Sequence, residues 1–455
     1  MPANEPHPKY DEFLPLWERL RDAAAGEDAV KDKGTLYLPV PPGLKNKGEK
    51  SPEYKNYKIR AKYPESVGPA IEGMAGLMSR KEMEIKLPEA MKYMEKLATS
   101  DGLDMAGLIN RIRHEVLTVG RYVLLVDVQE NGGNPYIATY PAESLINWRS
   151  DGDKLTMAVF FEQVNEPGPD DPYVMQEIDQ WRVCLLQEGQ YTVNVYRKDS
   201  EDENRLKLMS TTVPKRKGEP LDFVPVAIIG SRDLLPDPDA IPLLSIANKS
   251  LHYYRQYADY ALHLFMAANG TTPYAIGDYD VDKDAPQEIG PATIWAFGSA
   301  NVKVGFIEIS GNGIQAQKEE LDNISQEIAY ATVKVLGDKR AAEATETLRL
   351  RFQSQTATLA SIAKAKASGL RQALQFAASW LGVDPDKVEV DPSLEFIREL
   401  PDPQVINVLM NGVERGLMPH DILAEYMKQT EMHDMSIEEF LKLAPAALAM
   451  DSGDE

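Results

Sequence analysis

Residues 311–316 carry the strongest pattern for chemistry in this chain, the G-x-G-x-x-A sequence Gly311-Asn-Gly313-Ile-Gln-Ala316. It follows a predicted strand at 302–309 and opens a predicted helix, and such glycines let a backbone approach a pyrophosphate at a helix N-terminus. An NAD(P)-binding enzyme using Gly311, Gly313 and Ala316 is therefore one interpretation. Against it, that site requires a second parallel strand ending in an acidic residue, whereas Lys339-Arg340 and another helical pattern come next.

No other pattern supplies the parts of an active site. None of the six histidines has the spacing of a metal-ligand pair, and the single cysteine, Cys184, excludes an intrachain disulfide and predicts a buried side chain. Gly43 to Gly48 has the glycine spacing of a phosphate loop, but Glu49 stands where the lysine is needed. Asp170-Asp171 lies between Gly168-Pro169 and Pro172, as in a solvated turn. We expect no catalytic residue, no metal and no cofactor.

The composition predicts a large folded protein with a strongly acidic surface. The chain has 455 residues, of which 43% are hydrophobic, and a formal net charge of −22. This charge argues against a general nucleic-acid coat, since phosphate binding draws on clustered lysine and arginine. Acidic side chains could instead form a wall along which DNA slides, or they could simply keep the protein soluble. The sequence has no run of about 18 apolar residues and no signal-peptide pattern, so we expect no membrane contact.

The pattern of apolar residues predicts an α+β fold. A helix is predicted from Tyr10 to Ala25, with its regular part starting at Pro15. From Arg121 to Gly230 the period changes to two, which indicates strands. A helix rich in tyrosine is predicted from Pro242 to Ala268, and a smaller one from Pro403 to Arg415.

Two long helices are predicted from Gly313 to Leu336 and from about Glu346 to Trp380. In the first, apolar residues such as Leu321, Ile324 and Ile328 recur at helical spacing, while the other positions are polar. Helices of this length with a short charged joint suggest packing between subunits around an axis. A coiled-coil hairpin within one subunit explains the pattern equally well.

Several segments together resemble one family of tailed-bacteriophage portal proteins. The resemblance begins near Pro8, extends to about Thr356, and depends on the order and spacing of these segments: Pro8-Lys-Tyr10, Trp17-Glu-Arg-Leu-Arg-Asp22, Gly26-Glu-Asp-Ala-Val-Lys31, Tyr37-Leu-Pro39, Tyr57, Arg60-Ala61, Gly120-Arg-Tyr-Val-Leu-Leu-Val-Asp127, Pro141-Ala-Glu-Ser-Leu-Ile-Asn-Trp148, Ile241-Pro-Leu-Leu244, Asn248 and Tyr254. The C-terminal hundred or so residues match only in being helical.

This resemblance implies a portal-like α+β fold with a mixed α/β wing, a helical stem, a β-rich clip, a long tunnel helix and a helical crown. The regions that it implies in this chain are a first wing part at 1–196, a clip at 197–239, a stem helix at 240–269, a second wing part with the tunnel helix at 270–336, a tunnel loop at 337–345 and a crown at 346–455. On the tunnel loop, Lys339 and Arg340 would contact phosphates in a DNA channel, unless they belong to an ordinary solvated turn.

The family's function is also implied by the resemblance. Portal proteins form rings, usually of about twelve subunits, at one vertex of the capsid, and they carry no catalytic site. They conduct the genome during packaging and ejection, and they dock the terminase and the head-to-tail adaptor. The implied partners are therefore other copies of the chain, terminase, adaptor, major capsid and scaffold proteins, and double-stranded DNA. The implied location is the virion, after synthesis in the host cytoplasm. Another structural head protein, a scaffold or an adaptor, is the further alternative.

Overall fold

The computed structural model describes residues 3–42, 48–128, 133–152, 154–168, 171, 173–199, 202, 205–268, 272–278, 280, 296–297, 299, 301–307, 311–336, 345–396, 403–429, 432, 435, 437 and 439. The chain divides into two compact units. The first contains Met1–Gly76 and Glu82–Pro392, and the second contains Leu77–Lys81 and Ser393–Glu455. Helices and strands are both abundant, so the predicted α+β class is confirmed.

The N-terminal part of the first unit is helical. Helix α1 (Pro8–Ala25) begins at Pro8, where a missing N–H costs nothing, and the His7 side chain accepts a hydrogen bond from the Lys9 N–H. The predicted start of regular helix at Pro15 is wrong, because Pro15 lies inside α1. The short helical segments that follow α1 in this part are α2 (Glu27–Asp32), η1 (Gly34–Leu36), α3 (Pro52–Arg60), α4 (Val67–Ser79) and η3 (Glu89–Glu95). Two more short segments, η4 (Ala142–Ser144) and η5 (Pro385–Lys387), lie later in the chain.

A three-stranded antiparallel sheet lies at the centre of the first unit. Its order is β11 (Val226–Gly230), β2 (Arg121–Asp127) and β3 (Tyr136–Pro141). Every residue of β11 and the first six of β2 are buried. Helix α5 (Met105–Val119) precedes β2, and both it and α9 (Thr345–Leu381) contact β2. These helices cover apolar residues of the sheet that would otherwise be exposed to water.

The turn between α5 and β2 depends on glycine. Gly120 has φ 77°, in the left-handed region, and its N–H donates to the Val116 carbonyl. A Cβ atom at this position would lie 2.7 Å from the Ala240 carbonyl oxygen. The backbone of the segment that leads into α6 therefore passes directly over this turn.

A second, five-stranded antiparallel sheet has its strands in sequence order. They are β4 (Leu145–Asp151), β5 (Lys154–Pro167), β6 (Met175–Gln187), β7 (Gln190–Lys198) and β8 (Leu206–Thr212). Its core contains Ile146, Val159, Trp181 and Val183. The first unit also contains two short antiparallel strand pairs. These are β1 (Glu84–Lys86) with β14 (Glu389–Asp391), and β9 (Lys215–Arg216) with β10 (Glu219–Pro220).

The segment 197–239, for which a clip was predicted, contributes strands to three sheets, one of which, the β9–β10 pair, lies wholly inside the segment. Its strand β8 pairs with β7, and its strand β11 pairs with β2. The buried, wholly apolar sequence of β11 explains this result, because such a strand is stable only inside a covered sheet.

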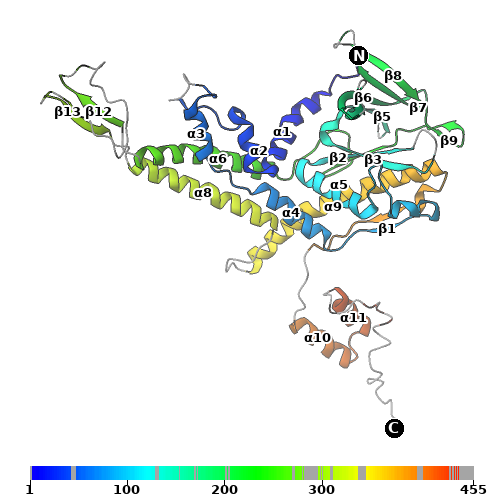
Figure 1. Cartoon of the computed structure of the whole chain (residues 1–455). Coiled ribbons are helices and arrows are strands. Elements are labelled where there is room, and N and C mark those ends of the chain that lie inside the picture. Colours follow the sequence, from blue (N-terminus) through cyan, green and yellow to red (C-terminus); the bar gives the residue numbers. More distant parts are fainter. Residues whose placement is uncertain are drawn as a thin grey trace. The chain divides into compact units, whose positions relative to one another are not determined.

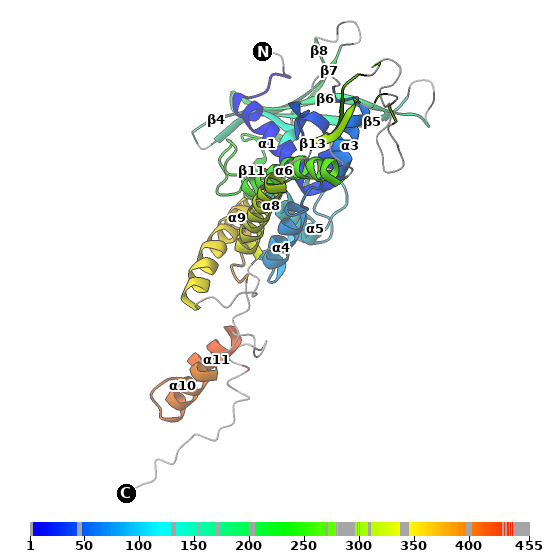
Figure 2. The same cartoon turned by 90° about the vertical axis from the view of Figure 1, so that its left-hand side faces the viewer.

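Helices α6 (Leu244–Ala268) and α8 (Gly311–Leu336) pack side by side, as both views show (Figures 1 and 2). Between them in the sequence, β12 (Thr272–Ile276) pairs antiparallel with β13 (Lys303–Ile307). We call α6, α8 and this strand pair the stalk. The strand pair lies at the end of the two helices (Figure 1). The predicted helices at 242–268 and 313–336 are thus present within two residues of their predicted ends.

The second unit contains two helices, α10 (Pro403–Glu414) and α11 (His420–Gln429), which contact each other. The predicted helix from Pro403 to Arg415 corresponds to α10. The connection turns at Gly416, where φ is 66°. Within the part of the chain that the structure describes, no helix is both long and apolar enough to span a membrane.

Candidate functional site: the stalk and its surroundings

The stalk has one buried apolar seam, and most of its other described surface on α8 is exposed to solvent. In α8, Leu321, Ile324 and Ile328 are buried, at the spacing of one helix face, and α6 is the helix packed beside it. Most other described side chains of α8 are exposed. Among the side chains that the structure describes on α8, this seam is the part that is fully buried.

Polar contacts fix the antiparallel register of the two helices. Lys249, near the start of α6, pairs with Glu327, near the end of α8. Towards the other end, His263 Nδ1 and Gln317 Oε1 are 3.0 Å apart. The bond from Lys249 lowers the pKa of Glu327.

The N-terminal helices hold the stalk against the body of the first unit. Tyr57 of α3 donates to Asp259 Oδ1 on α6 at 2.6 Å, and burial raises the Tyr57 pKa. The Arg60 guanidinium lies 3.7 Å from the centre of the Phe265 ring, close enough for a cation–π contact. The direction of α6 is therefore set by side chains from a segment about 200 residues earlier in the sequence.

A groove of about 950 Å³ runs between α6 and α8. Its charged lining consists of Lys249, Glu320 and Glu327, so carboxylates outnumber the cation and the cation is already paired. Glu319 and Asp322 on α8 are also exposed. This surface repels phosphate rather than binding it, which agrees with an acidic wall and not with a nucleotide pocket.

Lys339 and Arg340, the predicted DNA-contacting residues, lie outside the described residues. Helix α8 ends at Leu336 and α9 begins at Thr345, so the predicted loop at 337–345 connects these two helices in the sequence. The role of Lys339 and Arg340 as phosphate contacts stays a prediction.

The glycine pattern at 311–316 begins α8 but lacks the rest of a dinucleotide site. Gly311 is the first residue of α8, as the pattern predicts. The preceding strand β13, however, pairs antiparallel with β12, and the element after α8 is the helix α9. A dinucleotide site needs a parallel β-α-β arrangement, and the described strands around Gly311 do not form one. The enzyme alternative based on Gly311, Gly313 and Ala316 therefore has no structural support.

Other polar clusters of the first unit have structural explanations. Glu162 on β5 accepts hydrogen bonds from Tyr140, Gln180 and Arg182, all at 2.7 Å or less. Burial raises the pKa of Cys184 to about 12, and the Tyr191 hydroxyl lies 3.3 Å from its Sγ. Cys184 is thus a buried residue, as predicted, and no reactive thiolate. Among the described residues, no group of three His, Cys, Asp or Glu side chains could hold a metal ion.

Sequence analysis did not anticipate that Trp17, Arg121 and Trp148 come together. The Arg121 guanidinium lies 4.2 Å from the centre of the Trp148 ring and 5.9 Å from that of Trp17. Arg121 is only 1% exposed, burial lowers its pKa to about 9, and its Nη2 donates to the Pro236 carbonyl at 2.7 Å. All three residues belong to segments that carry the sequence resemblance, which was the one available signal.

Comparisons with known proteins give the following likenesses. A family model described as a domain of unknown function, DUF4055, matches residues 242–381, which is less than half of the chain. This match begins just before α6 and ends with α9. No curated protein matches the chain.

Similar solved structures come from gene transfer agent particles and from a phage portal protein. The neck of a native gene transfer agent particle, computed with C12 symmetry, is 13% identical, with 81% of this chain and 90% of that chain covered and a TM-score of 0.37. The neck of an empty particle is 11% identical, with 82% and 91% covered and a TM-score of 0.39. An HK97-family phage portal protein from Corynebacterium diphtheriae is 11% identical, with 72% and 92% covered and a TM-score of 0.31. At such scores these likenesses do not by themselves assign a function.

Proposed function

We propose that this chain is the subunit of a phage portal ring, which forms the conduit for the genome at one vertex of the capsid. The sequence resemblance from Pro8 to about Thr356 supports this function. Among the structural observations, the form of the stalk supports it most. A helix pair with one buried seam, acidic exposed faces and a small strand pair at its end is suited to packing beside identical copies around an axis. An isolated strand pair is only marginally stable in water, which also favours assembly.

The stalk changes the assignment of regions within the proposed portal. The stem is α6 together with α8, since these two helices are packed along their length. The clip is the segment between them, which includes β12 and β13, instead of 197–239. The two larger sheets with their helices form the wing, residues 337–345 the tunnel loop, and α10 and α11 part of the crown.

The proposed partners follow from these regions. The clip, at the end of the stem, docks the terminase during packaging and the head-to-tail adaptor afterwards. The acidic face of α8 borders the channel, where it repels the DNA backbone and lets it slide. In this function the chain acts without catalysis or cofactor of its own, contacts capsid and scaffold proteins, and is located in the virion at the portal vertex.

Mass measurement of the purified chain across salt concentrations tests the proposal. Like-charged subunits repel at low salt, and screening weakens this repulsion as salt is added. We expect a single large species of roughly twelve times 50.7 kDa at moderate salt. A monomer that persists at high protein concentration and high salt contradicts the proposal.

Ring size also separates the portal from the other structural head proteins. The portal proposal expects this chain to close a ring by itself, with the sheets and helices of the proposed wing present in every subunit.

A further inference from the structure

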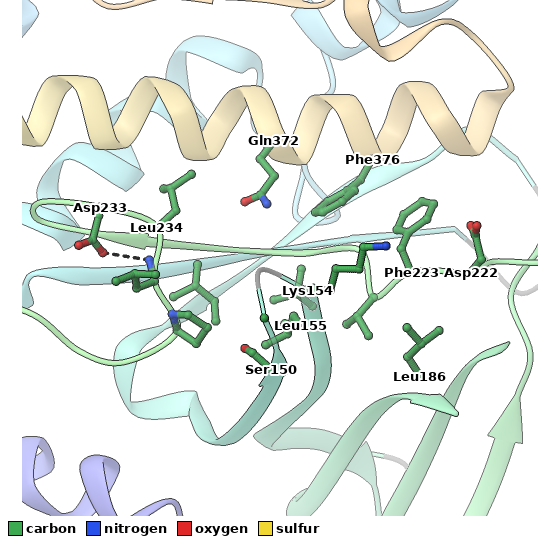
Figure 3. Close-up of a pocket in the computed structure, with 16 residues that line it drawn as sticks. Ser150, Lys154, Leu155, Leu186, Asp222, Phe223, Asp233, Leu234, Gln372 and Phe376 are labelled. Atoms are coloured by element: carbon green, nitrogen blue, oxygen red, sulfur yellow. Dashed lines mark hydrogen bonds between the residues drawn. The ribbon is translucent and has the colours of Figure 1, made fainter. Parts of the chain in front are cut away.

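A pocket lies between α9 and the two sheets of the first unit, and we call it the wing pocket. Its volume is about 510 Å³, and it is lined mainly by apolar side chains (Figure 3). Phe223 and Phe376 stack along one side, with ring centres 5.2 Å apart. Leu155 and Leu186 line it from the five-stranded sheet, and Leu235, at its edge, is 64% exposed.

The wing pocket leaves apolar surface and one cation uncovered. Lys154 lines the pocket, its side chain is exposed, and it makes no ion pair with any residue that the structure describes. The acidic residues at the pocket are Asp222 and Asp233, and Asp233 already accepts the Leu235 N–H at 2.9 Å. Because two carboxylates also line the pocket, an apolar segment matches it if any carboxylate that the segment carries faces Lys154.

The outer half of the β5–β6 hairpin offers such a segment. From Gln163↔Asp179 to Pro167↔Met175, the two strands pair only with each other, because β4 pairs no further along β5 than Phe160 and β7 no further along β6 than Gln180. The hairpin therefore extends beyond the neighbouring strands. We call Asp171 and residues 173–175 the hairpin tip.

The hairpin tip exposes large apolar side chains on a defined backbone. Tyr173 is 93% exposed, Val174 53% and Met175 57%. The Gly168 N–H donates to the Val174 carbonyl at 2.7 Å, and Asp171 Oδ1 accepts the Tyr173 N–H at 2.9 Å. A group of exposed apolar side chains is typical of a docking surface. Asp171 and Glu177 add exposed carboxylates beside them.

A subunit's hairpin tip cannot reach its own wing pocket. Lys154, at the pocket, is the first residue of β5, and Pro167, next to the tip, is the last. At roughly 3.3 Å per residue, the ends of this strand are about 40 Å apart. Any contact between tip and pocket must therefore join two copies of the chain. Such a contact uses different surfaces on the two copies, and a contact of that kind generates rings when its rotation closes.

We propose that the hairpin tip of one subunit inserts into the wing pocket of the adjacent subunit, with Tyr173, Val174 and Met175 covering the apolar lining and a tip carboxylate facing Lys154. This inference rests on the proposed ring. It makes the β5–β6 hairpin the element that links neighbouring wings, and the occupant of the pocket is a second copy of the chain.

Disulfide trapping in the assembled full-length chain tests this contact. Tyr173→Cys and Leu235→Cys, introduced together, place one thiol on the tip and one at the pocket. Both positions are exposed, so the substitutions leave the core intact, and the native Cys184 is buried. Mild oxidation should give a ladder of covalently linked subunits on a denaturing, non-reducing gel. The matched control combines Tyr173→Cys with Ile59→Cys, since Ile59 is 68% exposed and lies on α3.

The outcomes separate this inference from the proposed ring. A ladder with the tip–pocket pair, at least several-fold stronger than with the control pair, supports the inference. Rings that form without this ladder overturn the inference and leave the proposed function standing. A tip thiol that links to another protein instead also overturns it. Absence of any assembled species contradicts the proposed function, and the inference with it.

Discussion

The sheet around β2 and the stalk differ in how completely the chain covers them. In the sheet, β11 is buried along its entire length and β2 along nearly all of it, under helices of the same chain. In the stalk, α8 buries one seam against α6, and its exposed faces carry carboxylates. The first region is covered within one subunit, whereas the second leaves an exposed surface on which copies of the chain would pack in the proposed ring. Stability should therefore depend on the first region and assembly on the second.

The largest expected effect comes from the centre of the covered region. Trp17→Ala removes a fully buried side chain that packs near Arg121, and the cavity should lower the free energy of unfolding by about 3–5 kcal/mol. Chemical denaturation monitored by circular dichroism measures this loss. A loss under about 1 kcal/mol would show that this region is less closely packed than described. Tyr330→Ala, at an exposed stalk position, is the matched control and should leave the unfolding curve of the subunit nearly unchanged.

The buried charge of Lys366, on α9, provides the next test. Lys366 is 3% exposed, and burial together with Arg113 lowers its pKa to about 8, from an ordinary value of 10.5. Because the unfolded chain binds this proton more tightly, stability should rise as the pH increases from about 8 to 10.5. At pH 7 the full penalty is present, so Lys366→Met should stabilise the protein by up to about 3 kcal/mol.

This prediction is measured as a difference between the wild type and Lys366→Met. Buried tyrosines also titrate at high pH, so unfolding should be followed from pH 7 to 9.5, where the gap between the two proteins should narrow as the pH rises. A variant that is less stable than the wild type at pH 7 would mean that Lys366 has a stabilising partner in the folded protein.

Two glycines with the same φ angle allow the effect of a close backbone contact to be measured separately from the effect of backbone strain. Gly120 and Gly189 both have φ 77°, but only Gly120 has a backbone atom, the Ala240 carbonyl oxygen, within reach of an added Cβ. Alanine at either position incurs the strain of the left-handed conformation, of order 1 kcal/mol. Gly120→Ala should cost more than Gly189→Ala in thermal unfolding. Equal losses would contradict the contact between this turn and the segment before α6.

The smallest effect is expected in the stalk. Lys249→Met breaks the ion pair with Glu327, which is exposed to solvent, so subunit stability should change less than in any variant above. A double-mutant cycle with Glu327→Gln measures the coupling. A coupling as large as the effect of Trp17→Ala would remove the distinction between the two regions.

The sequence predicted where helices and strands lie better than it predicted which strands pair with each other. Helices α6 and α8 were predictable because their apolar residues repeat at helical spacing over 20 or more residues. Pro15 suggested a later start for α1, but burial of Trp17 and Leu20 holds the helix through that proline. β7 and β8 are neighbours in the sequence and pair as a hairpin, but β11 pairs with β2 from far earlier in the chain, which local periodicity could not show.

The candidate site was predictable only in part. Spacing alone identified the amphipathic seam of α8, because that seam is local to one helix. The antiparallel pairing of β12 with β13, which removes the support for a dinucleotide site, is set by residues about 30 positions apart. The contact of Arg121 with Trp17 and Trp148 likewise joins three separate segments, and no local pattern predicts it.

Electron microscopy of the purified full-length protein at moderate salt tests the central claim, that the stalk is completed by neighbouring copies around an axis. The account predicts a closed ring of about twelve subunits with a central hole, in which adjacent stalks pack together and the acidic face of α8 borders the hole. Isolated subunits at every salt and protein concentration, or a ring whose stalks lie apart from one another, would contradict it.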